Sequence, residues 1–111
     1  MPYPQFDRGR LVLRPLAERA HDLDLSVIMP LDAEVEDYPD PDLDVLAGRI
    51  VAACERGGEV LLMMGAHVLQ QGNSRVIIDL MRRGIITHVG TNGACAIQDF
   101  EFSLIGATTE N

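Results

Sequence analysis

Two loops of small and polar residues follow apolar runs in the sequence, where each would lead from a strand into a helix. The first has the sequence GAHVLQQGN (residues 65–73), and the second has the sequence TNGA (residues 91–94). Such a loop presents backbone N–H groups and the positive end of a helix dipole, and Gly93 would let a ligand approach the backbone closely. Both loops are therefore candidates for binding a phosphate or diphosphate, although neither matches GxGxxG or the P-loop.

Four side chains near these loops have types suited to acid–base or nucleophilic chemistry. Asp99 and Glu101 fall in the first turns of the helix that follows the second loop, where a carboxylate either caps the helix, meets a partner subunit or binds ligand hydroxyls. Capping is the simpler role for Asp99, and both kinds of role stay open for Glu101. His67 could be a general acid or base, but a lone histidine is more often a surface or packing residue. Cys95 could be exposed, and as a nucleophile it would need a base such as His88 beside it.

The charged residues exclude two classes of function. All nine cations are arginine, so the chain cannot supply a Schiff base or a lysine nucleophile by itself. The formal net charge is -8 and the cations are dispersed, which argues against a nucleic-acid partner. Much of the negative charge lies at residues 32–44. These acidic side chains are most simply explained as solvated surface residues, and the functional alternative is that they attract an amine or repel an anion.

The two cysteines and the apolar runs set further limits. Cys54 and Cys95 form no CxxC pair and have no histidine at metal-ligand spacing, so no metal site is predicted. Cys54 falls on the apolar face of a predicted helix and is expected to be buried and inert, and Met63 and Met64 are expected in the core. No apolar run approaches the roughly eighteen residues that span a bilayer, and residues 1–10 lack a signal-peptide core. We therefore expect a soluble, cytoplasmic protein.

Five elements would position the two loops. They are a helix after a cap at Asp40 or Asp42 that ends at Gly57, a strand at 59–65, a helix at 74–83 capped by Ser74, a strand at 85–90 and a helix at 96–106. The strand at 59–65 reads as fully buried, and the helix at 74–83 is apolar on nearly every side, so it should be buried or lie at an interface. Residues 66–73 are predicted as a loop. Before these elements, short strands are predicted at 10–16 and 26–31, followed by an exposed acidic loop at 31–42.

This order implies an α/β fold in which a right-handed crossover joins two parallel strands, as in doubly wound sheets. The chain divides into an N-terminal segment with the acidic loop (1–39) and a helix-strand-helix-strand-helix core (40–111). With 111 residues it can form one small domain. Two well-defined strands are few for such a sheet, so we expect the chain to be part of a larger fold.

Residues 65–106, with the sequence GAHVLQQGNSRVIIDLMRRGIITHVGTNGACAIQDFEFSLIG, resemble the amino-terminal part of deoxyhypusine synthase and its bacterial deoxyhypusine synthase-like relatives. The resemblance is close over residues 59–111 and looser over residues 6–58. It implies a Rossmann-like parallel sheet flanked by helices, incomplete in this chain, and a homotetramer with NAD near its subunit interfaces. The family oxidises spermidine and transfers the aminobutyl group, through an imine on an enzyme lysine, to a lysine of a translation factor.

The resemblance also assigns cofactor-binding residues. The segment Gln70-Gln71-Gly72 takes the place of the family's Ser-Ser-Gly loop at the dinucleotide, and Asp99 matches the aspartate of its His-Asp pair. Thr91, Gly93 and Ala94 match the second cofactor loop, with Asn92 where the family has threonine or alanine. Gln98 stands where the family often has histidine. Glu101 is added because its position in the helix after the second loop makes it a candidate for binding ligand hydroxyls. The predicted NAD-binding residues are therefore Gln70, Gln71, Gly72, Thr91, Asn92, Gly93, Ala94, Asp99 and Glu101.

Two hypotheses follow. The first is the NAD-binding portion of a deoxyhypusine synthase-like transferase that uses spermidine or a related amine. No catalytic residue is assigned to this chain, since the family's imine-forming lysine lies in the carboxyl-terminal half. The second is a non-catalytic α/β oligomerisation module whose apolar helix at 74–83 is buried against a partner subunit.

Overall fold

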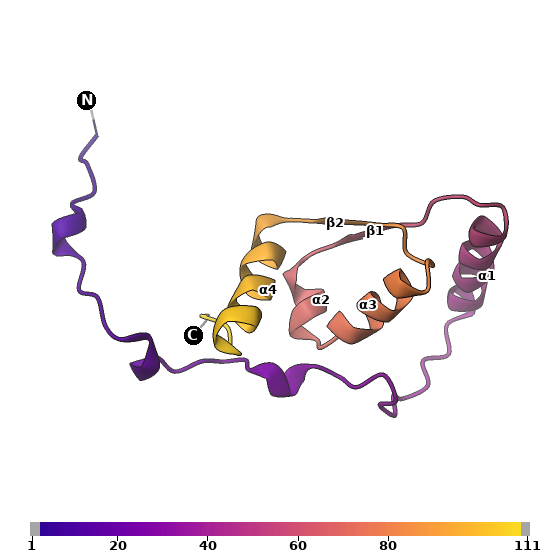
Figure 1. Ribbon diagram of the computed structural model, residues 1–111, viewed down its shortest axis with the longest axis horizontal. Coiled ribbons are helices and arrows are strands. Elements are labelled where there is room, and N and C mark those ends of the chain that lie inside the picture. The colour runs from indigo at the N-terminus through magenta and orange to yellow at the C-terminus, as the bar shows by residue number, and fades with distance from the viewer. Residues whose placement is uncertain (1–2, 110–111) are drawn as a thin grey trace.

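In the computed structural model, residues 3–109 are described, and they form four α-helices and a two-stranded parallel sheet (Figure 1). The elements are α1 (Pro41–Glu55), β1 (Leu61–Met64), α2 (Ala66–Gln70), α3 (Ser74–Arg82), β2 (His88–Thr91) and α4 (Gly93–Ile105). Three 3-10 turns precede them at Arg8–Arg10, Leu16–Glu18 and Leu25–Val27. The predicted α/β class and the order helix, strand, helix, strand, helix are confirmed, with α2 as an additional short helix.

The two strands pair in parallel, as predicted. Leu61 is opposite His88 and Met64 is opposite Thr91, so both strands end at the same edge of the sheet. The Thr87 hydroxyl extends the pairing, since it accepts from Val60 N at 2.9 Å and donates to Val60 O at 3.1 Å. Helices α2 and α3 form the crossover between the strands, and α2, α3 and α4 all lie on one side of the sheet (Figure 1).

Capping residues fix the ends of the longer helices. The Asp40 carboxylate accepts from Asp42 N at 2.9 Å and begins α1, so Asp40 is the cap between the two candidates. Gly106 ends α4 in the left-handed region with φ of 70°, as predicted. The predicted cap at Ser74 is wrong: Ser74 is the first residue of α3, and Asn73 in the cap position makes no side-chain cap bond.

The predicted loop at residues 66–73 is wrong in its first half, because Ala66–Gln70 form helix α2. Apolar residues drive this turn, since Leu69 is buried where α2 packs against α4. The loop proper is the short segment that follows. Gly72 there adopts φ of 78°, which favours glycine.

The predicted strands at 10–16 and 26–31 are also wrong. Residues 8–18 make two isolated 3-10 turns, and residues 25–27 make a third, begun by Asp24, whose carboxylate accepts from Ser26 N at 2.8 Å. Both segments contain a proline, which lacks the N–H that a strand would donate. The acidic loop at 31–42 is exposed, as predicted, up to the start of α1 at Pro41.

Residues 23–29 cross the helices as a strap bonded to three points of the fold. Leu25 N donates to Gly106 O at 3.1 Å, Thr108 N donates to Leu23 O at 2.9 Å, and Met29 N donates to Gly72 O at 3.1 Å. Asp24 and Ala107 form an isolated antiparallel bridge. The strap therefore holds the segment after α4 and the turn after α2 together.

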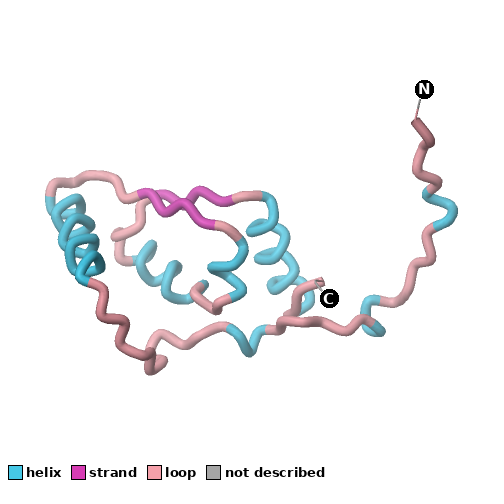
Figure 2. Tube along the Cα trace, turned by 180° about the vertical axis from the view of Figure 1, so that it is seen from behind, coloured by secondary structure: helices cyan, strands magenta, loops and turns pink. Residues whose placement is uncertain are grey.

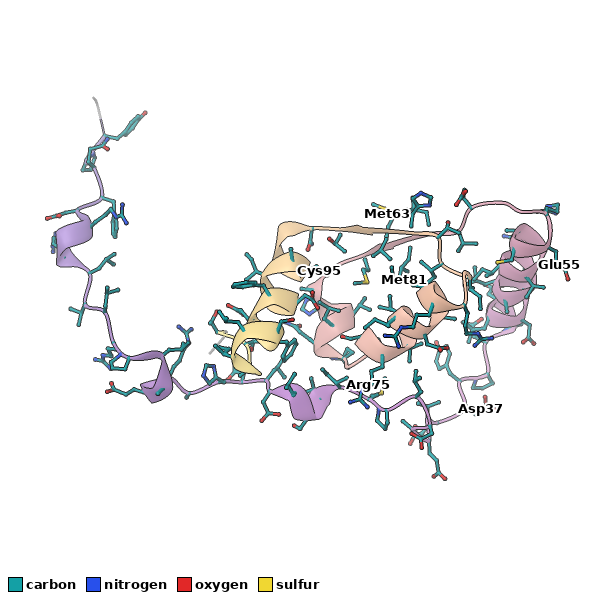
Figure 3. All side chains as sticks on the ribbon, viewed as in Figure 1. Asp37, Glu55, Met63, Arg75, Met81 and Cys95 are labelled. Carbon is teal, nitrogen blue, oxygen red and sulfur yellow. The ribbon has the colours of Figure 1, made fainter. Side chains whose placement is uncertain are left out.

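The buried core is small. Its apolar members are Leu69, Ile86, Cys95, Phe102 and Ala107. The prediction of a fully buried strand is wrong for this chain, because Met63 is 71% exposed on the face of β1 away from the helices, as Figure 3 shows. The predicted burial of the helix at 74–83 is not seen within the chain either, since Val76, Ile78 and Met81 are exposed. Cys54 is half-buried, with its Sγ 3.9 Å from Ile85 O.

The molecule is extended. Its radius of gyration is 19.3 Å, whereas a compact chain of this length has about 13 Å. Its accessible surface of 9170 Å² also exceeds the roughly 6,100 Å² of a compact protein of this mass. Figure 2 shows the cause, because the segment at residues 3–18 leaves the helices and does not fold back onto them. Within residues 3–109, none of the helices has the length and apolar character needed to cross a membrane.

Candidate ligand-binding site

The carboxyl ends of β1 and β2 bring two of the predicted loop segments together. Gly65 follows β1 and Asn92 follows β2, and a Cβ added at Gly65 would lie 3.5 Å from Asn92 Nδ2. The Asn92 carboxamide accepts from Cys95 N at 3.0 Å and caps α4. The edge where a parallel α/β sheet binds ligands is therefore formed by residues 65–66 and 91–94.

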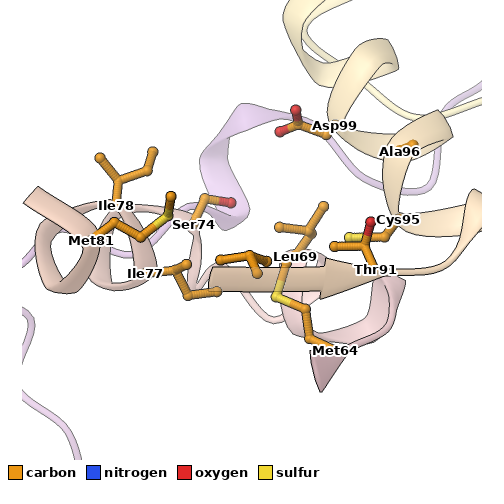
Figure 4. Close-up of a pocket in the computed structure, with 11 residues that line it drawn as sticks. Met64, Leu69, Ser74, Ile77, Ile78, Met81, Thr91, Cys95, Ala96 and Asp99 are labelled. Carbon is orange, nitrogen blue, oxygen red and sulfur yellow. The ribbon is translucent and has the colours of Figure 1, made fainter. Parts of the chain in front are cut away.

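A cavity of about 350 Å³ lies beside this edge, between α3 and α4. Figure 4 shows side chains of α3 on one side of it and Ala96 and Asp99 of α4 on the other. Its lining residues are Met64, Leu69, Ser74, Ile77, Ile78, Met81, Val89, Thr91, Cys95, Ala96 and Asp99. An apolar wall with a few polar groups at this volume is typical of small-molecule sites.

Three polar side chains reach the cavity from different elements. Ser74 begins α3, Thr91 ends β2, and Asp99 lies in the second turn of α4. Asp99 contributes the one carboxylate among the lining residues and can accept hydrogen bonds from ligand hydroxyls or an amine. Two predicted cofactor residues, Thr91 and Asp99, therefore line the same cavity.

Between Thr91 and Asp99, the first residues of α4 are exposed to solvent. Asn92, Gly93 and Ala94 are exposed, and a side chain added at Gly93 would meet nothing within 4 Å. This agrees with the expectation that Gly93 leaves room beside the backbone. The Asn92 side chain is occupied by its cap bond to Cys95 N.

Gln70, Gln71 and Gly72 lie away from this edge, at the other end of α2. The backbone at Gly72 is covered by the strap, so that an added Cβ would collide with Val27 O. A glycine is required here because the chain's own backbone approaches it. The structure therefore brings Gly65, and not Gly72, beside the second loop.

Glu101 is committed to a contact within the chain. Its carboxylate accepts from Thr109 N at 3.0 Å and also from the Thr109 hydroxyl. These two hydrogen bonds lower the pKa of Glu101 and outweigh the opposing effect of burial, and the charges of Arg19 and His21 lower it by smaller amounts. Glu101 therefore anchors the segment after α4 and does not line the cavity.

The structure separates Cys95 from the histidine that would have to activate it. Cys95 is 3% exposed, so the expectation that it could be exposed is wrong. Burial, and to a lesser degree the charge of Asp99, raises the pKa of its thiol and keeps it protonated at neutral pH. His88 lies at the opposite end of β2, where its Nδ1 is 3.3 Å from a carboxylate oxygen of Glu59.

The remaining polar candidates lie outside the cavity. His67 is exposed on α2, and its Nδ1 is 2.5 Å from Gln70 Oε1. Gln98 is buried on α4, and its Oε1 is left without a hydrogen-bond partner. Among the described residues, no group of three or more His, Cys, Asp or Glu could hold a metal ion.

The apolar walls of the cavity were not among the predicted site residues. Ile77, Ile78 and Met81 come from the helix that was predicted to be buried, and Met64 comes from the strand predicted for the core. The prediction that this helix is apolar on nearly every side is wrong, because Arg75, Asp79 and Arg82 give α3 a polar side. The signal that could have found the cavity wall is the helical spacing of Ile77, Ile78 and Met81, which puts these three residues on one side of the helix.

The residues present fit part of a dinucleotide. A flat apolar ring suits the wall from α3, and the carboxylate of Asp99 suits the hydroxyls of a ribose, the role that an acidic residue has in dinucleotide-binding sheets. Family models, curated proteins and solved structures were compared with the chain, and none of them gave a significant match.

Proposed function

We propose that this chain is the NAD-binding portion of a deoxyhypusine synthase-like transferase. The reaction would be an NAD-dependent transfer of an aminobutyl group from spermidine or a related amine. The observation that carries the proposal is that Thr91 and Asp99, two positions assigned from the family resemblance, line one cavity at the carboxyl edge of the parallel sheet.

In this proposal the adenosine half of NAD occupies the cavity. Its base packs against Ile77 and Met81, and its ribose hydroxyls donate to the Asp99 carboxylate. The diphosphate lies near the exposed start of α4 at Gly93, where backbone N–H groups and the helix dipole favour an anion. Bound NAD supplies the hydride acceptor, and the imine-forming lysine comes from outside this chain, which has no lysine.

Calorimetric titration of NAD tests the proposal. We expect NAD to bind the wild-type chain and Asp99→Asn to weaken binding about tenfold, as the loss of a hydrogen bond to a charged group predicts. NADP should bind more weakly than NAD, because its extra phosphate would lie beside the Asp99 carboxylate. Asp44→Asn is the matched control, since it removes a carboxylate from α1, outside the cavity, and should leave the affinity unchanged.

Absence of NAD binding, or an equal loss in both variants, would count against the cofactor proposal. The second candidate, a non-catalytic oligomerisation module, would then be favoured. It is supported by the exposed apolar residues Val76, Ile78 and Met81 of α3, and it predicts assembly that does not respond to NAD.

A further inference from the structure

The segment at residues 3–20, here called the basic arm, is both apolar and positively charged. It contains four arginines (Arg8, Arg10, Arg14 and Arg19) against two acidic residues, although the whole chain carries -8. Its large apolar side chains are exposed, with Leu13 at 87%. The backbone hydrogen bonds that it makes at its 3-10 turns join residues only three apart. Little within the molecule therefore holds this arm in place before Arg19, which donates to Thr109 O.

Residues 32–44, here called the acidic segment, have the opposite character. This segment contains seven acidic residues and no cation. It also exposes apolar side chains between the charges, with Tyr38 73% exposed. Asp37 and its neighbours lie outside the helices and the sheet, as Figure 3 shows. The acidic segment therefore matches the basic arm in both charge and apolar content.

In the structure, the basic arm and the acidic segment of one molecule do not meet. The strap at residues 23–29 lies between them in the sequence and is bonded to Gly72, Gly106 and Thr108. The arm leaves the strap in one direction and the acidic segment leaves it in the other (Figure 1). The molecule is 58 Å long on its longest axis, and the two segments lie toward its opposite ends.

We propose that the basic arm of one molecule binds the acidic segment of a second copy of the chain, and that the second copy's arm binds the first in return. A two-fold dimer of this kind uses both segments of both molecules. The apolar side chains of the arm, such as Phe6 and Leu13, would supply contact area against Val35, Tyr38 and the exposed side of α1. The opposite charges would fix the partner and its direction.

The exposed surface is large enough for such an interface. The chain exposes about 3,000 Å² more than a compact protein of its mass, whereas a stable interface buries roughly 1,600 Å² over both partners. The proposed dimer does not involve the cavity beside Thr91 and Asp99 and does not depend on NAD binding. Failure of either proposal can therefore be recognised without the other.

Sedimentation equilibrium of the chain without NAD tests the dimer. We expect a dimer at about 50 mM NaCl, and a dissociation constant at least about tenfold higher at about 500 mM NaCl, because salt screens exposed charge pairs. A wild-type chain that stays monomeric at low salt, or forms only larger assemblies, would overturn the proposal.

Charge reversal then identifies the two surfaces. The arm variant Arg8→Glu/Arg10→Glu/Arg14→Glu should raise the dissociation constant at least about tenfold at low salt. The acidic-segment variant Asp32→Arg/Glu36→Arg/Asp37→Arg should do the same. A mixture of the two variants pairs a reversed arm with a reversed segment, so a heterodimer should re-form.

A control variant changes the net charge by the same amount as the arm variant, at positions outside both segments. It is Arg56→Glu/Arg75→Glu/Arg82→Glu, at three exposed positions outside both segments. It should keep the wild-type dissociation constant, and circular dichroism should show unchanged helix content in every variant. Equal dissociation in this control, or no heterodimer in the mixture, would show that the arm and the acidic segment do not pair.

Discussion

At the scale of single residues, Gly72 shows most directly how the fold constrains the sequence. Its φ of 78° is unfavourable for other residues, and Val27 O occupies the space that a side chain would need. Gly72→Ala should therefore lower the free energy of unfolding by about 2 kcal/mol or more, through strain at φ and loss of the strap contact. Urea unfolding followed by circular dichroism measures this change.

Gly48→Ala is the matched control for this prediction. Gly48 lies inside α1, and an added Cβ there meets nothing within 4 Å. The substitution should raise helix stability by about 0.5–1 kcal/mol, because alanine loses less backbone entropy in a helix. A destabilisation of the same size in both variants would contradict the role given to Gly72.

Glu101 makes the free energy of unfolding depend on pH in the acidic range. Its two hydrogen bonds from Thr109 lower its pKa in the folded state below the value of about 4.3 in the unfolded chain. The resulting stabilisation is present above that unfolded value and is lost as pH falls through the folded-state pKa. Glu101→Gln should remove this part of the acid dependence in urea unfolding measured from about pH 6 to about pH 3. Glu55→Gln, which removes an exposed carboxylate from α1, should retain it.

At the scale of elements, α1 depends on its cap more than the other helices do. It has no fully buried residue, so little tertiary packing supports it. Asp40→Ala should cost about 1 kcal/mol of local helix stability and should increase amide hydrogen exchange in the first turns of α1. Asp42→Ala keeps the cap and is the control. An equal increase in exchange for both variants would exclude capping as the cause.

Most elements were predictable because their signals are local. The cap at Asp40, the stop at Gly106 and the apolar runs at β1 and β2 all act within a few residues, and the order of elements and the parallel pairing are confirmed. The errors share a different origin. Helix α2 forms because Leu69 packs on α4, a contact that the local sequence of α2 does not reveal. The segment at 26–31 is held by a hydrogen bond to Gly72 and by the preceding residues, which bond to the end of α4. Neither partner can be read from the sequence of that segment.

In the candidate site, too, the positions set by local sequence were predictable and those set by distant contacts were not. Thr91 and Asp99 were predicted and lie in one cavity, since both follow directly from where β2 ends and α4 begins. Gln70 and Gln71, which the resemblance assigns to the cofactor, lie one short helix away from the edge of the sheet because they are at the end of α2. Glu101 was ambiguous because its partner, Thr109, lies in a segment with no regular structure.

At the scale of the whole molecule, exposed apolar surface is the dominant feature. Within residues 3–109, apolar side chains are left exposed on one face of the sheet, on α3 and over much of α1. Helices pack on one face of the parallel sheet, whereas parallel sheets are normally covered on both faces. The buried core of the described residues is therefore small for a chain of this length.

The strap has a consequence for the order in which the molecule folds. It joins Leu25 to Gly106 and Leu23 to Thr108, which closes loops of about 80 residues. Contacts between positions so distant in sequence form late, whereas the strand and helix contacts from β1 to α4 involve much shorter separations. During synthesis the strap cannot close until the ribosome has released Thr108, near the last of the described residues. The cavity between α3 and α4 can therefore assemble before the strap closes.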